Sequence, residues 1–149
     1  MDKIESLLVD IMELKLLTNK NHINNSNEFN NKIKEVKNLI EDIPLDSCFS
    51  TDSDIIFSCK FSKFLYRNTF RKTSYNTMFV HAYKVAEILY RNNASKETVI
   101  AGLLHDVIED TPYKEYILRI FFNDVIMNTV LFHTEDKSKS WEIRKLTTI

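Results

Sequence analysis

The sequence predicts an all-α protein, and three observations support this prediction. Glycine occurs once and proline twice in 149 residues, which leaves little basis for glycine-dependent hairpins or phosphate-binding loops. Apolar residues recur at intervals of three and four in several stretches, which is the spacing of an amphipathic helix. No stretch shows a convincing strand pattern, and the chain contains no internal repeat.

The first 50 residues predict two amphipathic helices joined by a polar loop. The apolar positions are Ile4, Leu7, Leu8 and Ile11 in the first helix and Phe29, Ile33, Val36 and Ile40 in the second. The second helix is expected to end before Pro44, because proline cannot continue a helix. We expect residues 1–50 to form a helical extension that packs on the rest of the chain or pairs two copies in a homo-oligomer.

Residues 51–149 predict a helical domain. Apolar density rises in "IIFSCKFSKFLYRN", and further helices are expected at about 79–92, 96–110, 113–122, 124–132 and from about 140 to the end. In the second of these six helices Val85, Ile88 and Leu89 are expected to face the core. In the third, apolar residues form a wide stripe that indicates a central, buried helix.

Composition excludes several classes of function. Apolar residues make up 44% and charged residues 28%, and the net charge is −1, so no overall field attracts nucleic acid. No apolar stretch is long enough to span a membrane, and no signal peptide is recognisable. We therefore expect a cytoplasmic protein without nucleic-acid or membrane partners, in which Cys48 and Cys59 are reduced thiols.

The segment "LLHDVIEDTP", residues 103–112, carries the candidate chemistry. The imidazole of His105 and the carboxylate of Asp106 suit Mn²⁺, Fe²⁺, Co²⁺ or Zn²⁺. A third ligand is needed, and His81 supplies one if its helix packs antiparallel to the helix that contains His105. Glu109 and Asp110 lie one turn beyond this pair and could orient or deprotonate a water molecule.

The residues alone leave a second interpretation open. A histidine and an aspartate at a helix end can simply pair with each other for stability. Glu109 and Asp110 at a helix C-terminus oppose the helix dipole, which weakly indicates that a cation lies nearby. Such pairs at helix ends are usually structural, so composition alone favours the structural pair over the metal site.

A resemblance favours the metal site. "HDVIEDT", 24 residues after His81, resembles the HD-domain metal-dependent phosphohydrolases, and more narrowly the RelA/SpoT-type alarmone hydrolases, including their short stand-alone members. The resemblance extends from about residue 56 to the end and includes "FRKTSYNTMFVHAYKVAEIL", "VIAGLLHDVIEDT", "FFNDVIMNTV" and "TEDKSKSWEIRKLTTI". It implies an HD-domain helical bundle with an N-terminal extension.

The resemblance also implies roles for individual residues. It assigns metal binding to His81, His105 and Asp106, positioning of the attacking water to Glu109 and Asp110, nucleotide contacts to Arg71 and Lys72, and a phosphate contact to Lys137. The metal is usually Mn²⁺ in this family. Members remove the 3′-pyrophosphate from guanosine tetra- or pentaphosphate, the alarmones of the stringent response, and some relatives dephosphorylate NADPH.

The sequence departs from the family pattern in several places, among them the proline-tyrosine pair before the metal histidine, which is Thr77-Met78 here, and the proline after it, which is Ala82. A later helix of the family carries "AD-(K/R)-x-x-N", whose aspartate completes the metal site, and this chain stops at Ile149 before such a helix. We expect a C-terminally truncated domain, a ligand from another chain, or a weakened site. Where the family has His-x-Gly-Gln, this chain has "YRNT", Tyr66–Thr69. Asn123 stands where the family has a glycine, and we expect it to take a left-handed backbone, which asparagine tolerates.

Two functions follow as hypotheses. The first is a metal-dependent phosphohydrolase that removes a phosphate or 3′-pyrophosphate from a nucleotide such as guanosine tetraphosphate (ppGpp). The second is a catalytically lapsed or incomplete HD domain that acts as a regulatory or interaction scaffold.

Overall fold

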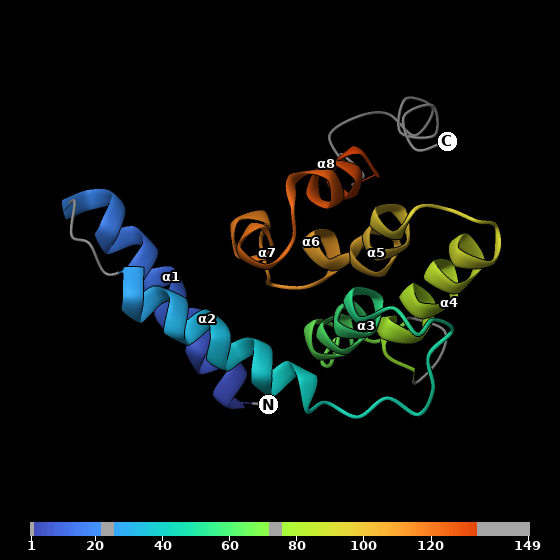
Figure 1. Ribbon diagram of the computed structural model, residues 1–149, viewed down its shortest axis with the longest axis horizontal. Helices are drawn as coiled ribbons and strands as arrows, with labels where there is room; N and C mark the ends of the chain where they lie inside the picture. Colours follow the sequence, from blue (N-terminus) through green and yellow to red (C-terminus); the bar gives the residue numbers. More distant parts are fainter. Residues whose placement is uncertain (1, 22–25, 72–75, 134–149) are drawn as a thin grey trace. The chain divides into compact units, whose positions relative to one another are not determined.

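The computed structural model of the chain describes residues 2–21, 26–71 and 76–133. The helices, shown in Figure 1, are α1 (Asp2–Asn21), α2 (Ser26–Glu41), α3 (Ser53–Leu65), α4 (Met78–Arg91), α5 (Lys96–Leu104), α6 (Val107–Asp110), α7 (Glu115–Phe121) and α8 (Asp124–His133). Within the described residues, the only β pairing is an isolated bridge between Phe70 and Thr77. The predicted all-α class is confirmed. The helix expected from about residue 140 lies outside the described residues.

The chain divides into two compact units, Met1–Asp46 and Ser47–Ile149. In the first unit α1 packs against α2. Two ion pairs join these helices, from Lys3 to Glu35 at 3.3 Å and from Lys32 to Asp10 at 3.4 Å. All four predicted apolar positions of α1 are buried, whereas in α2 only the last two, Val36 and Ile40, are. The role of the first unit as an extension of a hydrolase domain stays a prediction.

Helix α5 is the centre of the second unit. It packs against α3, α4 and α8, and every residue from Val99 to Leu104 is buried. Gly102 faces α4, where an added Cβ would lie 2.8 Å from Cδ1 of Leu89 and 3.6 Å from Cα of Ala86. The missing side chain therefore lets α4 and α5 approach closely, which sets the distance between the residues they carry.

Two expectations for this unit are wrong in detail. Ile88 is 61% exposed, and α4 instead buries Ala82 and Ala86. Small side chains are favoured on that face because α5 lies so close. Asn123 does not have a left-handed backbone. Among the described residues other than glycine, that conformation is found at Asn93, with φ 61°. Asn123 instead accepts the Ile126 N–H at 2.9 Å through Oδ1 and so caps the start of α8.

Within the described residues, none of the helices is both long and apolar enough to cross a membrane. Both cysteines are free, and their Sγ atoms lie 4.0 Å apart. The structure therefore agrees with the expectation of reduced thiols. Burial raises the pKa of the Cys59 thiol well above its ordinary value, which keeps it protonated.

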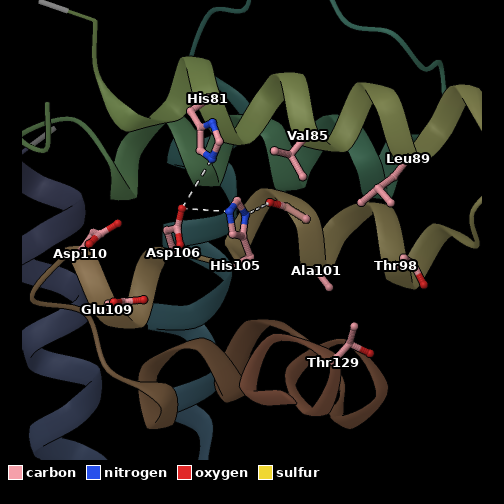
Figure 2. A pocket seen from close by; sticks show the side chains of 11 residues that line it. His81, Val85, Leu89, Thr98, Ala101, His105, Asp106, Glu109, Asp110 and Thr129 are labelled. Carbon is pink, nitrogen blue, oxygen red and sulfur yellow. Dashed lines mark hydrogen bonds and ion pairs between the residues drawn. The ribbon is translucent and has the colours of Figure 1, made fainter. Parts of the chain in front are cut away.

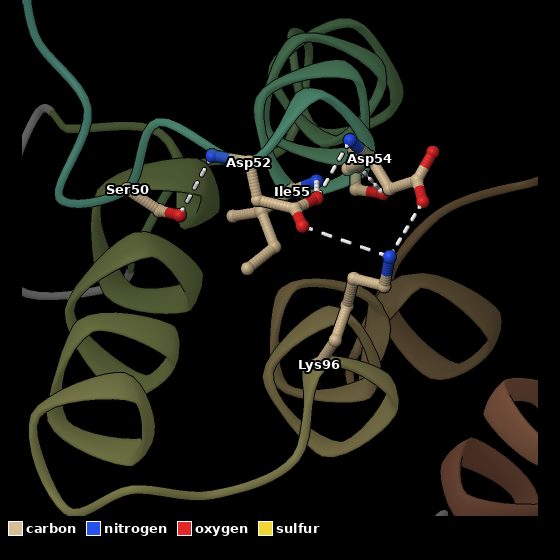
Figure 3. A network of polar contacts seen from close by, with 6 residues as sticks. Ser50, Asp52, Asp54, Ile55 and Lys96 are labelled. Atoms are coloured by element: carbon tan, nitrogen blue, oxygen red, sulfur yellow. Dashed lines mark hydrogen bonds and ion pairs between the residues drawn. The ribbon is translucent and has the colours of Figure 1, made fainter.

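A polar network, drawn in Figure 3, joins the starts of α3 and α5. Asp52 is the N-cap of α3, and its Oδ1 accepts the N–H groups of Asp54 at 2.8 Å and Ile55 at 3.2 Å. Lys96 in the first turn of α5 places Nζ 2.8 Å from Asp54 and 3.6 Å from Asp52. The N–H of Asp52 donates to Oγ of Ser50. The network therefore ties the start of α3 to the start of α5.

We expect the Asp52 cap to make stability depend on pH. The Ile55 N–H lowers the pKa of Asp52, against some desolvation, and the Asp54 N–H and Lys96 add to this effect. Because the folded-state pKa is lowered, the charged cap stabilises the fold above the unfolded value and loses that effect as pH falls through the folded value. Asp52→Asn keeps a capping side chain but removes the charge. The difference in free energy of unfolding between wild type and Asp52→Asn should therefore become smaller as the pH falls from about 6 to about 3.

Urea unfolding of wild type, Asp52→Asn and Asp52→Ala at both pH values measures this. Asp52→Ala should be less stable than Asp52→Asn at each pH, because it loses the cap as well. A deficit of Asp52→Asn that does not change with pH would contradict the assignment.

Candidate metal centre

A break between two helices brings His105 and Asp106 together. The sequence predicts one helix over residues 96–110, and this is wrong, because α5 ends at Leu104 and α6 begins at Val107. Consecutive side chains of a continuous helix point about 100° apart. At the break, Asp106 has φ −102° and ψ 1°, and Nε2 of His105 lies 2.9 Å from Oδ2 of Asp106, as Figure 2 shows. The break therefore makes two neighbouring residues converge on one point.

His81 reaches the same point from the first turn of α4. Its Nε2 lies 3.8 Å from Oδ2 of Asp106, and its ring centroid lies 5.5 Å from that of His105. One ligand atom from each of the three residues lies within 4.8 Å of the others. Figure 2 shows the end of α5 beside the start of α4, as the antiparallel packing expected from the sequence requires.

The hydrogen bond of the other ring nitrogen orients His105. Nδ1 lies 2.6 Å from the carbonyl oxygen of Gly102. A carbonyl only accepts, so Nδ1 carries a hydrogen and donates it. In the neutral ring, Nε2 then has a free lone pair directed toward Asp106. Metal-binding histidines are commonly held by such a bond on the second nitrogen.

The electrostatics of the three residues differ. Burial alone would lower the pKa of His105, but its hydrogen bond to Asp106 and the charge of Asp106 outweigh burial and raise it. Burial tends to raise the pKa of Asp106, yet the bond to His105 and the charges of both histidines lower it. Burial lowers the pKa of His81, and the charge of His105 adds to this. The Asp106 carboxylate is therefore favoured in its ionised form, mainly through its hydrogen bond with His105.

Two imidazole nitrogens and one carboxylate oxygen fit a borderline divalent ion. An ion with bonds of about 2.1 Å keeps its ligand atoms about 3 Å apart, so a small rotation of the His81 side chain completes the set. The three side chains are 22–33% exposed, which leaves room for further ligands on the open side. The donor set and its geometry therefore fit a metal that also binds water or substrate.

The three residues line one end of a cavity of about 580 Å³. Glu109 and Asp110 of α6 line the same cavity beside Asp106, as Figure 2 shows. The walls continue along α4, α5 and α8 through Val85, Leu89, Thr98, Ala101, Gly102 and Thr129. The cavity thus joins a cluster of acidic and imidazole groups to a mainly apolar arm.

The predicted nucleotide-binding residues lie less centrally. Arg71 is exposed and is not among the residues that line the cavity. Its charge still lowers the pKa of His81, which places it within electrostatic reach of the centre. Lys72 and Lys137 lie outside the described residues, so the structure does not bear on their predicted roles.

Sequence reasoning did not find Tyr66. Its side chain is fully buried, and its hydroxyl accepts the N–H of Asp106 at 3.2 Å. The available signal was weak, because a tyrosine among apolar residues usually belongs to the core. Its one distinguishing feature was its place in the "YRNT" departure from the His-x-Gly-Gln pattern.

Residues 58–146, more than half of the chain, match the family described as HD domain. The chain belongs to the HD domain family. It is also 37% identical over 76 residues to a probable guanosine-3′,5′-bis(diphosphate) 3′-pyrophosphohydrolase of Mycoplasma pneumoniae (strain ATCC 29342 / M129 / Subtype 1). That alignment covers 51% of this chain and 10% of the relative.

The two matches support the resemblance to RelA/SpoT-type hydrolases. The chain spans about a tenth of the length of the curated relative it matches, so the activity of that relative is not transferred by the match alone. No solved structure matches the chain.

We expect the metal-free protein to hold His105 as the Nδ1–H tautomer. At a pH above the raised pKa of His105 the ring is neutral, and the bond to the Gly102 carbonyl keeps the hydrogen on Nδ1. As pH falls through the raised pKa of His105, Nε2 also takes a proton, which Asp106 accepts in a hydrogen bond. Long-range ¹⁵N–¹H NMR of the two rings, assigned with a His81→Ala variant, measures this. An Nε2–H tautomer for neutral His105 would contradict the orientation that a metal ligand requires.

Proposed function

We propose that the chain is a metal-dependent phosphohydrolase of the HD class. Its proposed substrate is a nucleotide with an exposed phosphate or pyrophosphate, with ppGpp as the first candidate. The observation that carries this proposal is the convergence of His81, His105 and Asp106 at one end of a cavity that Glu109 and Asp110 also line. Membership of the HD domain family supports it, and the named relative supports the choice of ppGpp.

The proposed metal, Mn²⁺ by resemblance, would be held by His81, His105 and Asp106. When bound, such an ion supplies a Lewis acid that polarises a phosphoryl oxygen and makes a nearby water more acidic. The Gly102 carbonyl keeps the lone pair of His105 Nε2 directed at the site. The lowered pKa of His81 keeps its ring neutral, and therefore able to bind a metal, down to a lower pH than an ordinary histidine.

Glu109 and Asp110 are the proposed groups that orient the attacking water and accept its proton. Both are on the single turn of α6, on the cavity side of the break. Hydrolysis then needs no covalent nucleophile, because an activated water attacks phosphorus and the nucleotide oxygen leaves. The carboxylates would also repel a misplaced phosphate, so the anionic group must enter on the metal side.

Arg71 is the proposed contact for the second anionic group of the substrate. It is exposed, and its charge lowers the pKa of His81, which supports a role in binding an anionic group near the centre. A guanidinium suits this role because it binds phosphate with two parallel hydrogen bonds. Lys72 and Lys137 stay in the proposal through the resemblance alone.

Variants of the acidic and imidazole residues test the proposal. We expect wild type to bind about one Mn²⁺ per chain and to hydrolyse ppGpp, and His105→Ala and Asp106→Ala to lose both, because each removes a ligand. Glu109→Gln and Asp110→Asn should retain the metal but lose about 100-fold or more in rate, because they remove groups that handle the proton. Metal analysis and nucleotide chromatography measure the two effects.

Asp124→Asn is the matched control. Its carboxylate is exposed and pairs with Arg119 at 3.0 Å, outside the cavity. It should retain full metal content and rate. A wild-type protein that binds no Mn²⁺, Co²⁺ or Zn²⁺ would overturn the proposal and leave the scaffold hypothesis. Metal binding without release of phosphate or pyrophosphate from ppGpp or NADPH would overturn the choice of substrate.

A further inference from the structure

At the break between α5 and α6, the Gly102 carbonyl and the Asp106 N–H each have a partner other than the one a continuous helix would give them. In a continuous helix the N–H of Asp106 would donate to the carbonyl of Gly102, four residues earlier. Here that carbonyl accepts Nδ1 of His105, and the N–H of Asp106 donates to the hydroxyl of Tyr66. The bond to the Gly102 carbonyl therefore orients the His105 imidazole, and the bond to the Tyr66 hydroxyl holds the backbone of Asp106.

The Tyr66 hydroxyl lies in a dry environment. The side chain has no exposed surface, and it follows directly after α3, whose buried residues contact the α5 core. Burial raises the pKa of Tyr66 far above its ordinary value, and the charges of Asp106 and Asp110 add to this. The hydroxyl accepts the Asp106 N–H from a side chain that has no exposed surface.

Two hydrogen bonds join α3 and the residue that follows it to the chain around the break, but only one involves a metal-site residue. Oγ of Ser62 donates to the carbonyl of Leu103 at 3.1 Å, in the last turn of α5. The hydroxyl of Tyr66 accepts from Asp106 itself. The first contact holds the helix end, whereas the second sets the direction in which the Asp106 side chain leaves the backbone.

We propose that Tyr66 is a positioning residue of the metal centre, whose hydroxyl holds the Asp106 backbone so that the carboxylate faces His81 and His105. The inference rests on the proposed function. Tyr66 touches neither substrate nor metal, and it acts through Asp106. Residues that orient a metal ligand in this way typically change metal affinity by 10- to 100-fold when they are removed.

Tyr66→Phe tests the proposal, because it removes only the hydroxyl and keeps the volume of the buried ring. We expect the Mn²⁺ dissociation constant, measured by calorimetry, to rise by about 10-fold or more. The visible spectrum of the Co²⁺-loaded protein should change, since it reports the arrangement of the ligands. In metal-free protein, the Asp106 amide should exchange its hydrogen faster by NMR.

Ser62→Ala is the matched control. It removes a buried hydroxyl and a hydrogen bond on the same pair of helices, without contact to a metal-site residue. It should lower the melting temperature as Tyr66→Phe does, yet retain the Mn²⁺ affinity, the Co²⁺ spectrum and the protection of Asp106. The comparison separates positioning from a general loss of stability.

The outcomes distinguish the two proposals. If wild type binds metal, and Tyr66→Phe weakens binding no more than Ser62→Ala, the positioning role is overturned and the proposed function stands. Unchanged exchange of the Asp106 amide in Tyr66→Phe would overturn the role as well. If wild type binds neither Mn²⁺ nor Co²⁺, the proposed function fails, and the positioning role at a metal centre fails with it.

Discussion

The hydrogen bond from His105 to the Gly102 carbonyl is the interaction on which the rest of the site depends. It occupies the acceptor that an uninterrupted helix would offer to the Asp106 N–H. At this bond α5 ends at Leu104 and α6 begins at Val107, and the break brings two adjacent side chains to one point with Glu109 and Asp110 beside them. A break of this kind removes backbone hydrogen bonds of the helix, and the buried N–H and carbonyl groups at the break need other partners.

The close packing of α4 on α5 supplies the third predicted ligand. Gly102 has no side chain, and α4 presents Ala82 and Ala86 to the core, so the two helices approach closely. His81 lies in the same helix, one residue before Ala82, and therefore reaches Asp106. Gly102 thus has two roles, because its backbone accepts from His105 and its missing Cβ allows the approach of α4. A larger residue there would disturb both the distance to His81 and the setting of the carbonyl.

Much of this arrangement could be predicted from the sequence. Scarce glycine and helical periodicity predict the all-α class, and the "HDVIEDT" motif with His81 predicts the residues that converge. The break at His105 could not be predicted, because the apolar stripe continues through Val107 and Ile108 as it would in one helix. The role of Tyr66 depends on a contact between residues 40 positions apart, and the exposure of Ile88 depends on how closely α5 approaches. Local patterns contain neither kind of information.

The central claim is that His81, His105 and Asp106 form one divalent metal site at the helix break. The most direct test is a crystal grown with Mn²⁺ and measured at the manganese absorption edge, where anomalous scattering locates the ion. The account predicts one anomalous peak about 2 Å from Nε2 of both histidines and from the Asp106 carboxylate, with His105 Nδ1 still bonded to Gly102. A peak at other residues, or no peak at a saturating Mn²⁺ concentration, would contradict it.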